Sequence, residues 1–379
     1  MLVRCRLQHT ETMRIAYLLT SLGIGGAERQ VVALSERMRA RGHAAIILVL
    51  NPPVPEQWAA SAEVVHLNLR KTPLSVAKGF ARAVRVLREF QPDILHSHNF
   101  HGNLLGRLLR VALPGVSVIS SIHNIYEGGR LRMAAYWLSD PMTRCTVAVC
   151  KAAAEKMVKL GAAPRRKCIA IANGIDVDEF SPDVKRRECT RRQMMAKDAF
   201  IWLATGRIVP AKNYENLLRA FAWVRQTTQN AELWIAGEGK EEYAERMRAL
   251  SVELGLNGSI RWLGLRRDIA TLLDAGDGFV LSSAWEGMPL ALGEAMAMEK
   301  PAVATDVGGV RELVGDCGTV VAAGNSAALA KGMLKVMHGT ILDGKQTGQA
   351  ARRRIVERFS MDANAKAWEA LYCSVLMKD

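Results

Sequence analysis

The chain has 379 residues, more than one hydrophobic core usually supports, so its length predicts two domains. Apolar residues make up 49% of the chain, and the longest wholly apolar run covers only residues 44–50, too short to span a membrane. The seven cysteines are odd in number and include no Cys-x-x-Cys pair, which argues against a disulfide framework and a zinc site. We therefore expect a protein of a reducing compartment, the cytoplasm.

The formal net charge of +14 is unevenly distributed along the chain. Residues 1–200 contain 30 Lys and Arg against 16 Asp and Glu, whereas residues 201–379 contain 21 of each. The excess positive charge therefore belongs to the first half. It predicts an anionic partner there, either a nucleic acid or an acidic membrane surface.

The first twelve residues precede the first predicted strand, which starts near Met13. They lack the continuous apolar core of a secretory signal. We expect them to be a short disordered tail, or to lie outside the native protein because the start was assigned too early.

A predicted strand at residues 14–20 leads into a glycine turn that includes Gly25 and Gly26 and then into a helix. Strand, glycine turn and helix in this order are typical of phosphate-binding turns. The turn departs from the dinucleotide fingerprint, because Glu28 stands at its sixth position and the second strand ends at Asn51 without a carboxylate for a ribose. A nicotinamide-dependent dehydrogenase is therefore disfavoured.

Strands and helices alternate along both halves of the chain with short connections, which predicts parallel sheets covered by helices. A charged, breaker-rich tract at residues 173–198 separates the halves. We therefore predict an α/β protein with a basic N-terminal Rossmann-like domain at 13–182, a C-terminal Rossmann-like domain at 199–358 and a final helix at 359–379.

The stretch at residues 282–309 predicts a strand end, a loop that carries Glu286 and Gly287, and a helix whose first residue is Pro289. A helix start favours phosphate, while Glu286 and Glu294 can accept hydrogen bonds from sugar hydroxyls. Phosphate beside hydroxyls indicates a nucleotide sugar. Glycoside hydrolases also use two carboxylates, but they work without a phosphate cradle.

Arg207 and Lys212 follow one predicted strand and precede one helix. Two fixed cations can neutralise a departing diphosphate without a metal, although most Arg and Lys side chains are simply solvated. Because ligands of such sheets lie outside the carboxyl ends of the strands, we expect Arg207, the turn at Gly237 and the loop at Glu286 to share one pocket.

His123 ends a predicted strand, where it can contact a sugar hydroxyl or simply cap its loop. His96, His98 and His101 are grouped, but no carboxylate or cysteine lies near them, so we expect them to line a cleft rather than bind a metal. The Asp-x-Asp pattern at 176–178 lies in the linker, which disfavours a metal role there as well.

Basic residues recur at steps of three or four along the predicted helix at 73–90, opposite an apolar stripe. Such a helix either covers a sheet with its charged side in water or lies on an anionic membrane surface. Nucleic acid is disfavoured, because no helix-turn-helix or stacking platform accompanies the charge. The candidate membrane or acceptor contacts are Lys78, Arg82, Arg85, Arg88, Arg130 and Arg132.

Five motifs occur in order along nearly the whole chain: Gly-Gly-Ala-Glu at 25–28, Asn-Gly-Ile-Asp at 173–176, Gly-Arg at 206–207 with Lys212, Gly-Glu-Gly at 237–239, and two glutamates at 286 and 294. Together they resemble the retaining GT-B glycosyltransferases of the family 4 type. The resemblance implies two Rossmann-like domains facing across a cleft, with the final helix returning to the N-terminal domain.

The resemblance also implies an activity. A sugar, with a UDP-sugar favoured as donor, would pass without a metal cofactor to a hydroxyl of a glycan or lipid-linked acceptor. The reaction would serve bacterial cell-surface polysaccharide or lipopolysaccharide synthesis at the inner face of the cell membrane. A non-catalytic protein that binds sugar nucleotides or membranes is the alternative.

Carried over residue by residue, the resemblance implies that Arg207 and Lys212 bind the donor diphosphate. Glu286 and His123 would contact the donor sugar, and Glu294 would hold the ribose. The further implied donor contacts are Gly25, Gly26, Gly237, Gly287, Met288, Pro289 and Leu290.

Overall fold

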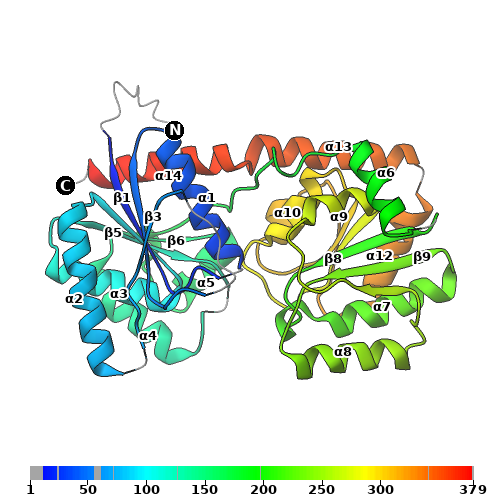
Figure 1. The fold of residues 1–379 in the computed structure, drawn as a ribbon, viewed down its shortest axis with the longest axis horizontal. Coiled ribbons are helices and arrows are strands. Elements are labelled where there is room, and N and C mark those ends of the chain that lie inside the picture. The colour runs from blue at the N-terminus through cyan, green and yellow to red at the C-terminus, as the bar shows by residue number, and fades with distance from the viewer. Residues whose placement is uncertain are drawn as a thin grey trace.

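The structure is a computed structural model that describes residues 12–23, 25–54, 61–70, 72–125, 127–196, 198–339 and 341–377. Two parallel sheets, each covered by helices, lie side by side, and helices α13 (Ile341–Arg358) and α14 (Met361–Leu376) run along both of them (Figure 1). The predicted pair of Rossmann-like domains is confirmed. The expectation for the first twelve residues falls almost wholly outside the described residues.

The first sheet has seven parallel strands in the order β3-β2-β1-β4-β5-β6-β7. Its strands are β1 (Arg14–Leu19), β2 (Ala44–Val49), β3 (Glu63–His66), β4 (Ile94–His98), β5 (Ser117–Ile122), β6 (Cys145–Ala148) and β7 (Cys168–Ala170). Its helices are α1 (Gly26–Ala40), α2 (Pro73–Phe90), α3 (Asn99–Ala112), α4 (Arg130–Ser139) and α5 (Lys151–Lys159), with 3-10 turns η1 (Asp140–Met142) and η2 (Arg165–Lys167). The central strands are buried on both faces, which explains their continuous apolar runs.

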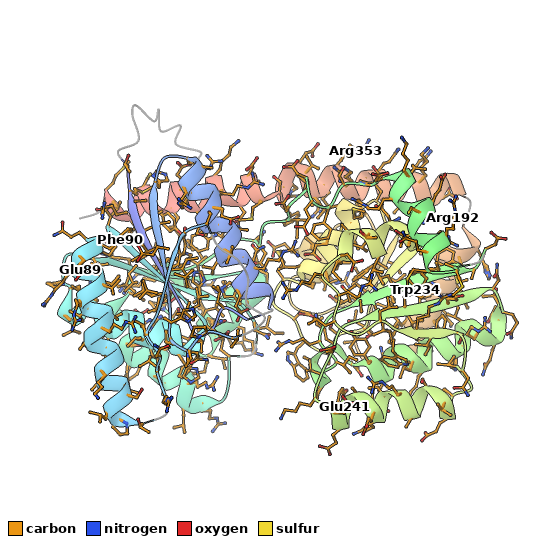
Figure 2. All side chains as sticks on the ribbon, in the orientation of Figure 1. Glu89, Phe90, Arg192, Trp234, Glu241 and Arg353 are labelled. Carbon is orange, nitrogen blue, oxygen red and sulfur yellow. The ribbon has the colours of Figure 1, made fainter. Side chains whose placement is uncertain are left out.

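The second sheet has six parallel strands in the order β10-β9-β8-β11-β12-β13. Its strands are β8 (Phe200–Thr205), β9 (Ala231–Ala236), β10 (Ile260–Trp262), β11 (Gly278–Leu281), β12 (Ala302–Thr305) and β13 (Thr319–Val321). Its helices are α7 (Tyr214–Thr227), α8 (Glu241–Glu253), α9 (Ile269–Ala275), α10 (Leu290–Ala297), α11 (Val310–Val314) and α12 (Ser326–His338), with the 3-10 turn η3 (Pro210–Lys212). Trp234 of β9 lies fully buried within this domain (Figure 2).

The order of strands reverses beside the first strand of each sheet. β1 lies between β2 and β4, and β8 lies between β9 and β11. At such a point neighbouring connections leave in opposite directions, and a crevice forms at the carboxyl ends of the strands. This geometry places Gly25 and His98 at the crevice of the first sheet, and Gly206 and Ser282 at that of the second.

Helix α14 belongs to the core of the first domain. Its Trp368 and Tyr372 side chains are buried in one cluster with Tyr17 of β1 and Leu34 of α1. The Tyr372 hydroxyl lies 2.7 Å from Nδ1 of His96. The expected return of the final helix to the N-terminal domain is confirmed.

The charged tract between the domains holds a helix, α6 (Val184–Gln193), where the sequence predicts only a linker. Its N-cap is Asp183, whose side chain accepts hydrogen bonds from two backbone N–H groups of the first turn. Arg187 and Arg191 both pair with Asp277, far along the chain. The helix was missed because these ion pairs, rather than an apolar stripe, hold it in place.

Candidate active site

The second domain brings two of the predicted site residues together. Nζ of Lys212 lies 2.6 Å from Oε1 of Glu286, and the Ser283 hydroxyl donates to the same oxygen at 2.7 Å. The Ser282 hydroxyl donates to the backbone carbonyl of Lys212 at 2.8 Å. The loops that follow the neighbouring strands β8 and β11 are thus tied to each other. A cation and a carboxylate lie at the switch point, where a ligand is expected.

Arg207 is exposed on the turn that follows β8. Gly237 packs directly against this turn, because a Cβ at Gly237 would lie 2.0 Å from the carbonyl oxygen of Gly206. A side chain is therefore excluded at Gly237. The glycine brings the loops after β8 and β9 together, at the edge where Arg207 can reach a phosphate.

The loop after β11 contacts the first domain. A Cβ at Gly287 would lie 2.1 Å from the carbonyl oxygen of His123, and the side-chain amide of Asn173 donates to the Met288 carbonyl at 3.1 Å. Gly287, Met288 and Pro289 are all buried. The predicted donor loop is thus enclosed between the two domains.

Helix α10 starts at Leu290, one residue later than predicted. Pro289 is its N-cap rather than its first residue, because its ψ of 111° is extended. A Cβ at Gly26 would lie 3.2 Å from Cδ1 of Leu290. The start of α1 in the first domain therefore faces the start of α10 in the second.

The glycine turn before α1 holds a carboxylate of the chain itself. Glu28 folds back over the helix start, so that a Cβ at Gly25 would lie 2.2 Å from its Oε2. The Ser21 hydroxyl donates to Oε1 of Glu28 at 3.2 Å. A carboxylate in the first turn complements the positive end of the helix, as a phosphate would. The sequence indicated an anion site here without showing that Glu28 reaches it.

Glu294 is buried and ion-paired across the domain interface. Nη1 of Arg29 lies 2.6 Å from its Oε1, and Nη2 of Arg29 lies 2.6 Å from Glu179 of the linker. Burial raises the pKa of Glu294, and the charge of Arg29 opposes that rise. A pocket of 180 Å³ between the domains is lined by these three residues, among others. Sequence reasoning missed Arg29, although its place in the first turn after the glycines could have suggested it.

His123 contacts another of the grouped histidines. Its Nε2 lies 2.9 Å from Nδ1 of His98, which is 3% exposed. His96 does not line a cleft, contrary to expectation, because it is fully buried between Tyr372 and Ser121. Strand β4 is buried along its whole length, so the His96 side chain lies in the core.

The predicted membrane contacts form part of a wider surface. All six basic residues are exposed on α2 and α4, and Arg132 also lies over the Phe100 ring at 4.6 Å. Large apolar side chains are exposed on α2, α3 and α4 as well: Leu74, Val76, Leu108, Val111, Leu131, Trp137 and Leu138. Helix α3 contacts both α2 and α4, and the exposed basic and apolar side chains of these three helices are here called the α2–α4 face.

In the part of the chain that the structure describes, no group of three or more His, Cys, Asp or Glu side chains could hold a metal ion. Asp176 accepts hydrogen bonds from the backbone N–H groups of Asp178 and Glu179, so it shapes a turn of the linker. No helix among the described residues is both long and apolar enough to cross a bilayer.

Two family models match the chain, one for each domain. Residues 24–179 match Glycosyltransferase Family 4, and residues 199–338 match Glycosyl transferases group 1. These spans contain the Arg29, His123, Lys212, Glu286 and Glu294 side chains described above.

Proteins named as bacterial glycosyltransferases are similar to the chain. One is the UDP-Gal:alpha-D-GlcNAc-diphosphoundecaprenol alpha-1,3-galactosyltransferase of Escherichia coli, 27% identical over 62% of this chain and 64% of that protein. The putative glycosyltransferase EpsD of Bacillus subtilis is 26% identical over 84% of this chain and 86% of its own length.

Among solved structures, Anabaena HepE in complex with UDP and glucose superposes with a TM-score of 0.85 at 21% identity, covering 96% of this chain and all of that one. This likeness shows the fold. With both domains matched by glycosyltransferase models, the chain belongs to the family 4 and group 1 glycosyltransferases of the GT-B fold.

Proposed function

We propose that this glycosyltransferase moves a sugar from a UDP-sugar to a hydroxyl of a glycan or lipid-linked acceptor, in the synthesis of bacterial cell-surface polysaccharide. The ion pair of Lys212 and Glu286 carries the proposal, because it sets a cation and a carboxylate at the switch point of the second sheet. Gly26 and His123 of the first domain face the same loop. The name of the Escherichia coli relative, with its UDP-galactose donor and undecaprenol-linked acceptor, supports the substrate classes.

The donor would lie between the domains. Arg207 and Lys212 would bind its diphosphate, since the three N–H donors of a lysine allow Lys212 to keep Glu286 while it binds phosphate. Glu286 would accept hydrogen bonds from the sugar, and Glu294 from the ribose. Oε1 of Glu294 accepts a hydrogen bond from Arg29, so Oε2 is the oxygen that we propose for the ribose.

We propose that the anomeric configuration is retained and that no metal takes part. The bond between the anomeric carbon and the diphosphate breaks as the acceptor oxygen bonds that carbon from the same face. The acceptor proton passes to a diphosphate oxygen, and UDP leaves. Arg207, Lys212 and the backbone N–H groups at the start of α10 would stabilise the charge that develops on the diphosphate.

The acceptor would approach on the first domain, with the α2–α4 face on an anionic membrane surface at the cytoplasmic side. Exposed Trp137 and Leu138 would enter the interface while Lys78, Arg82 and Arg85 bind lipid head groups. The excess positive charge of the first half of the chain supports this orientation.

The test is a screen of UDP- and GDP-sugars by thermal shift, followed by mass spectrometry of products formed with a polyprenyl-diphosphate-linked sugar. Proton NMR of the product reports the anomeric configuration, and a parallel reaction in EDTA tests the metal. A UDP-sugar that binds without any transfer to glycan or lipid-linked acceptors would favour the non-catalytic alternative. An inverted product would overturn the proposed stereochemistry.

A further inference from the structure

Two histidines that follow neighbouring strands share one hydrogen bond. His98 ends β4, His123 follows β5, and these strands are adjacent and parallel. Nδ1 of His98 lies 2.9 Å from Nε2 of His123, and the ring centroids are 5.2 Å apart. One of these nitrogens must carry a proton and the other a lone pair, so the tautomers of the two rings are coupled.

Both rings are neutral near pH 7. Burial lowers the pKa of His98 well below its ordinary value and that of His123 to about 4. Each ring therefore carries a single N–H. The shared hydrogen bond leaves two possible arrangements, which differ in which ring donates.

The other nitrogen of His98 decides between them. Nε2 of His98 is buried and has no hydrogen-bond partner among the described residues. A buried N–H without a partner is rarer than an acceptor without one. The proton of His98 is therefore on Nδ1, and His98 donates to Nε2 of His123.

We propose that His98 is a positioning residue that sets the tautomer of His123. By donating to Nε2, it leaves the proton of His123 on Nδ1, so that His123 presents an N–H to its ligand. The inference rests on the proposed function, in which that ligand is the donor sugar. It adds that the sugar oxygen facing His123 is a hydrogen-bond acceptor.

The position of His123 supports this role. Its backbone carbonyl lies against Gly287, in the loop proposed to hold the same sugar. The fixed backbone and the hydrogen bond to His98 together hold the ring in one orientation. A group held in this way contributes more to binding than one that must be ordered when the ligand arrives.

The tautomer is measured directly by ¹⁵N NMR of the full chain with labelled histidine. We expect His123 to be protonated on Nδ1 in the wild type. His98→Asn keeps a short-reach N–H donor and should preserve this tautomer, with turnover near that of the wild type. His98→Leu removes the donor and should shift His123 to Nε2–H, with kcat lowered about tenfold or more.

His66→Leu is the matched control, because Nδ1 of His66 bonds the Asn51 carbonyl on an edge strand away from the site. It should change neither the tautomer nor kcat. A wild-type His123 protonated on Nε2 overturns the inference, whether or not His98→Leu folds. If His123→Ala turns over like the wild type while the tautomer is as expected, the assigned role of His123 in the proposed function fails instead.

Discussion

Arg29 of α1 binds Glu294 of α10 at 2.6 Å, so a helix start in the first domain is ion-paired to a buried carboxylate of the second. Glu294 is 6% exposed, and few charges enter such a position without a partner. The pair joins residues that the sequence separates widely, and it gives the interface a specific charge contact.

Removing this pair should weaken donor binding. In Arg29→Gln, Glu294 keeps its burial but loses its main stabilising charge, so its pKa rises further. We expect a higher KM for the donor. When the pH is lowered, the variant should lose donor binding at a higher pH than the wild type does. The free energy of unfolding should drop by about 2 kcal/mol, less than for a fully buried pair.

Arg37→Gln is the control, since Arg37 pairs with Asp176 and Asp362 instead. Equal donor KM values in both variants would contradict the role of Arg29.

Lys212→Ala should lower kcat by about 10² to 10³ while the protein stays folded. The change removes a cation that we expect to stabilise the leaving diphosphate, and Glu286→Ala should be similarly inactive. Circular dichroism checks the fold, and product formation over time checks kcat. Lys335→Ala, on the exposed face of α12, serves as the control. Wild-type turnover in Lys212→Ala would contradict the assignment of this site to the donor diphosphate.

Gly287→Ala should disturb the contact between the domains, because its Cβ would lie 2.1 Å from the His123 carbonyl oxygen. The loop has to move away from His123, so we expect a lower Tm and a loss of activity. Gly115→Ala is a matched control, since nothing lies within 4 Å of a Cβ there. The two variants should differ clearly in Tm by calorimetry; equal values would mean that the loop is not held against the first domain.

The stability of the protein should depend on pH through Glu127, whose carboxylate accepts a hydrogen bond from the Tyr136 hydroxyl. Burial raises the pKa of Glu127 to about 7 from 4.5. Between these values the folded state holds a proton that the unfolded state has released, so stability falls as the pH rises. Across this pH range, the ionisation of Glu127 lowers the free energy of unfolding by about 3 kcal/mol at most.

Glu127→Gln cannot titrate, so its free energy of unfolding should decline less than that of the wild type from pH 4.5 to 7. Urea titrations across this range provide the measurement. Glu155→Gln, at an exposed position of α5, should keep the wild-type slope. A wild-type slope in Glu127→Gln would show that Glu127 ionises normally.

Reversing the charges of Lys78, Arg82 and Arg85 to Glu should reduce pelleting with anionic liposomes. Each basic residue near such a surface contributes about 1 kcal/mol, so the loss of three should weaken binding by about a hundredfold. The control reverses Arg246, Arg248 and Lys335 of the second domain, which changes the net charge equally. If both triple variants pellet alike, the α2–α4 face has no special role.

Local patterns in the sequence were sufficient to predict the sheets and the strand-end loops. Apolar runs followed by glycines identify the strand ends. Because ligands bind outside the carboxyl ends of the strands at the switch point, the sequence then predicts that Lys212 and Glu286 lie at one edge. What the sequence could not show depends on distant partners. Arg29 is important because it pairs with Glu294. His98 is important because its buried Nε2 lacks a partner among the described residues. Helix α6 is held by Asp274 of α9 and by Asp277, which follows α9. None of these pairings has a local signature.

Helix α14 also has a consequence for how the protein is made. Trp368 and Tyr372 complete a core that otherwise consists of the first strands and helices of the chain. During synthesis the first domain therefore emerges early but stays without part of its interior until α14 leaves the ribosome. His96 then lacks its Tyr372 partner throughout this interval. The second domain has all its strands once Val321 is made, and the last helix in its core is α13, so the half that is translated first waits longest for its last core helix.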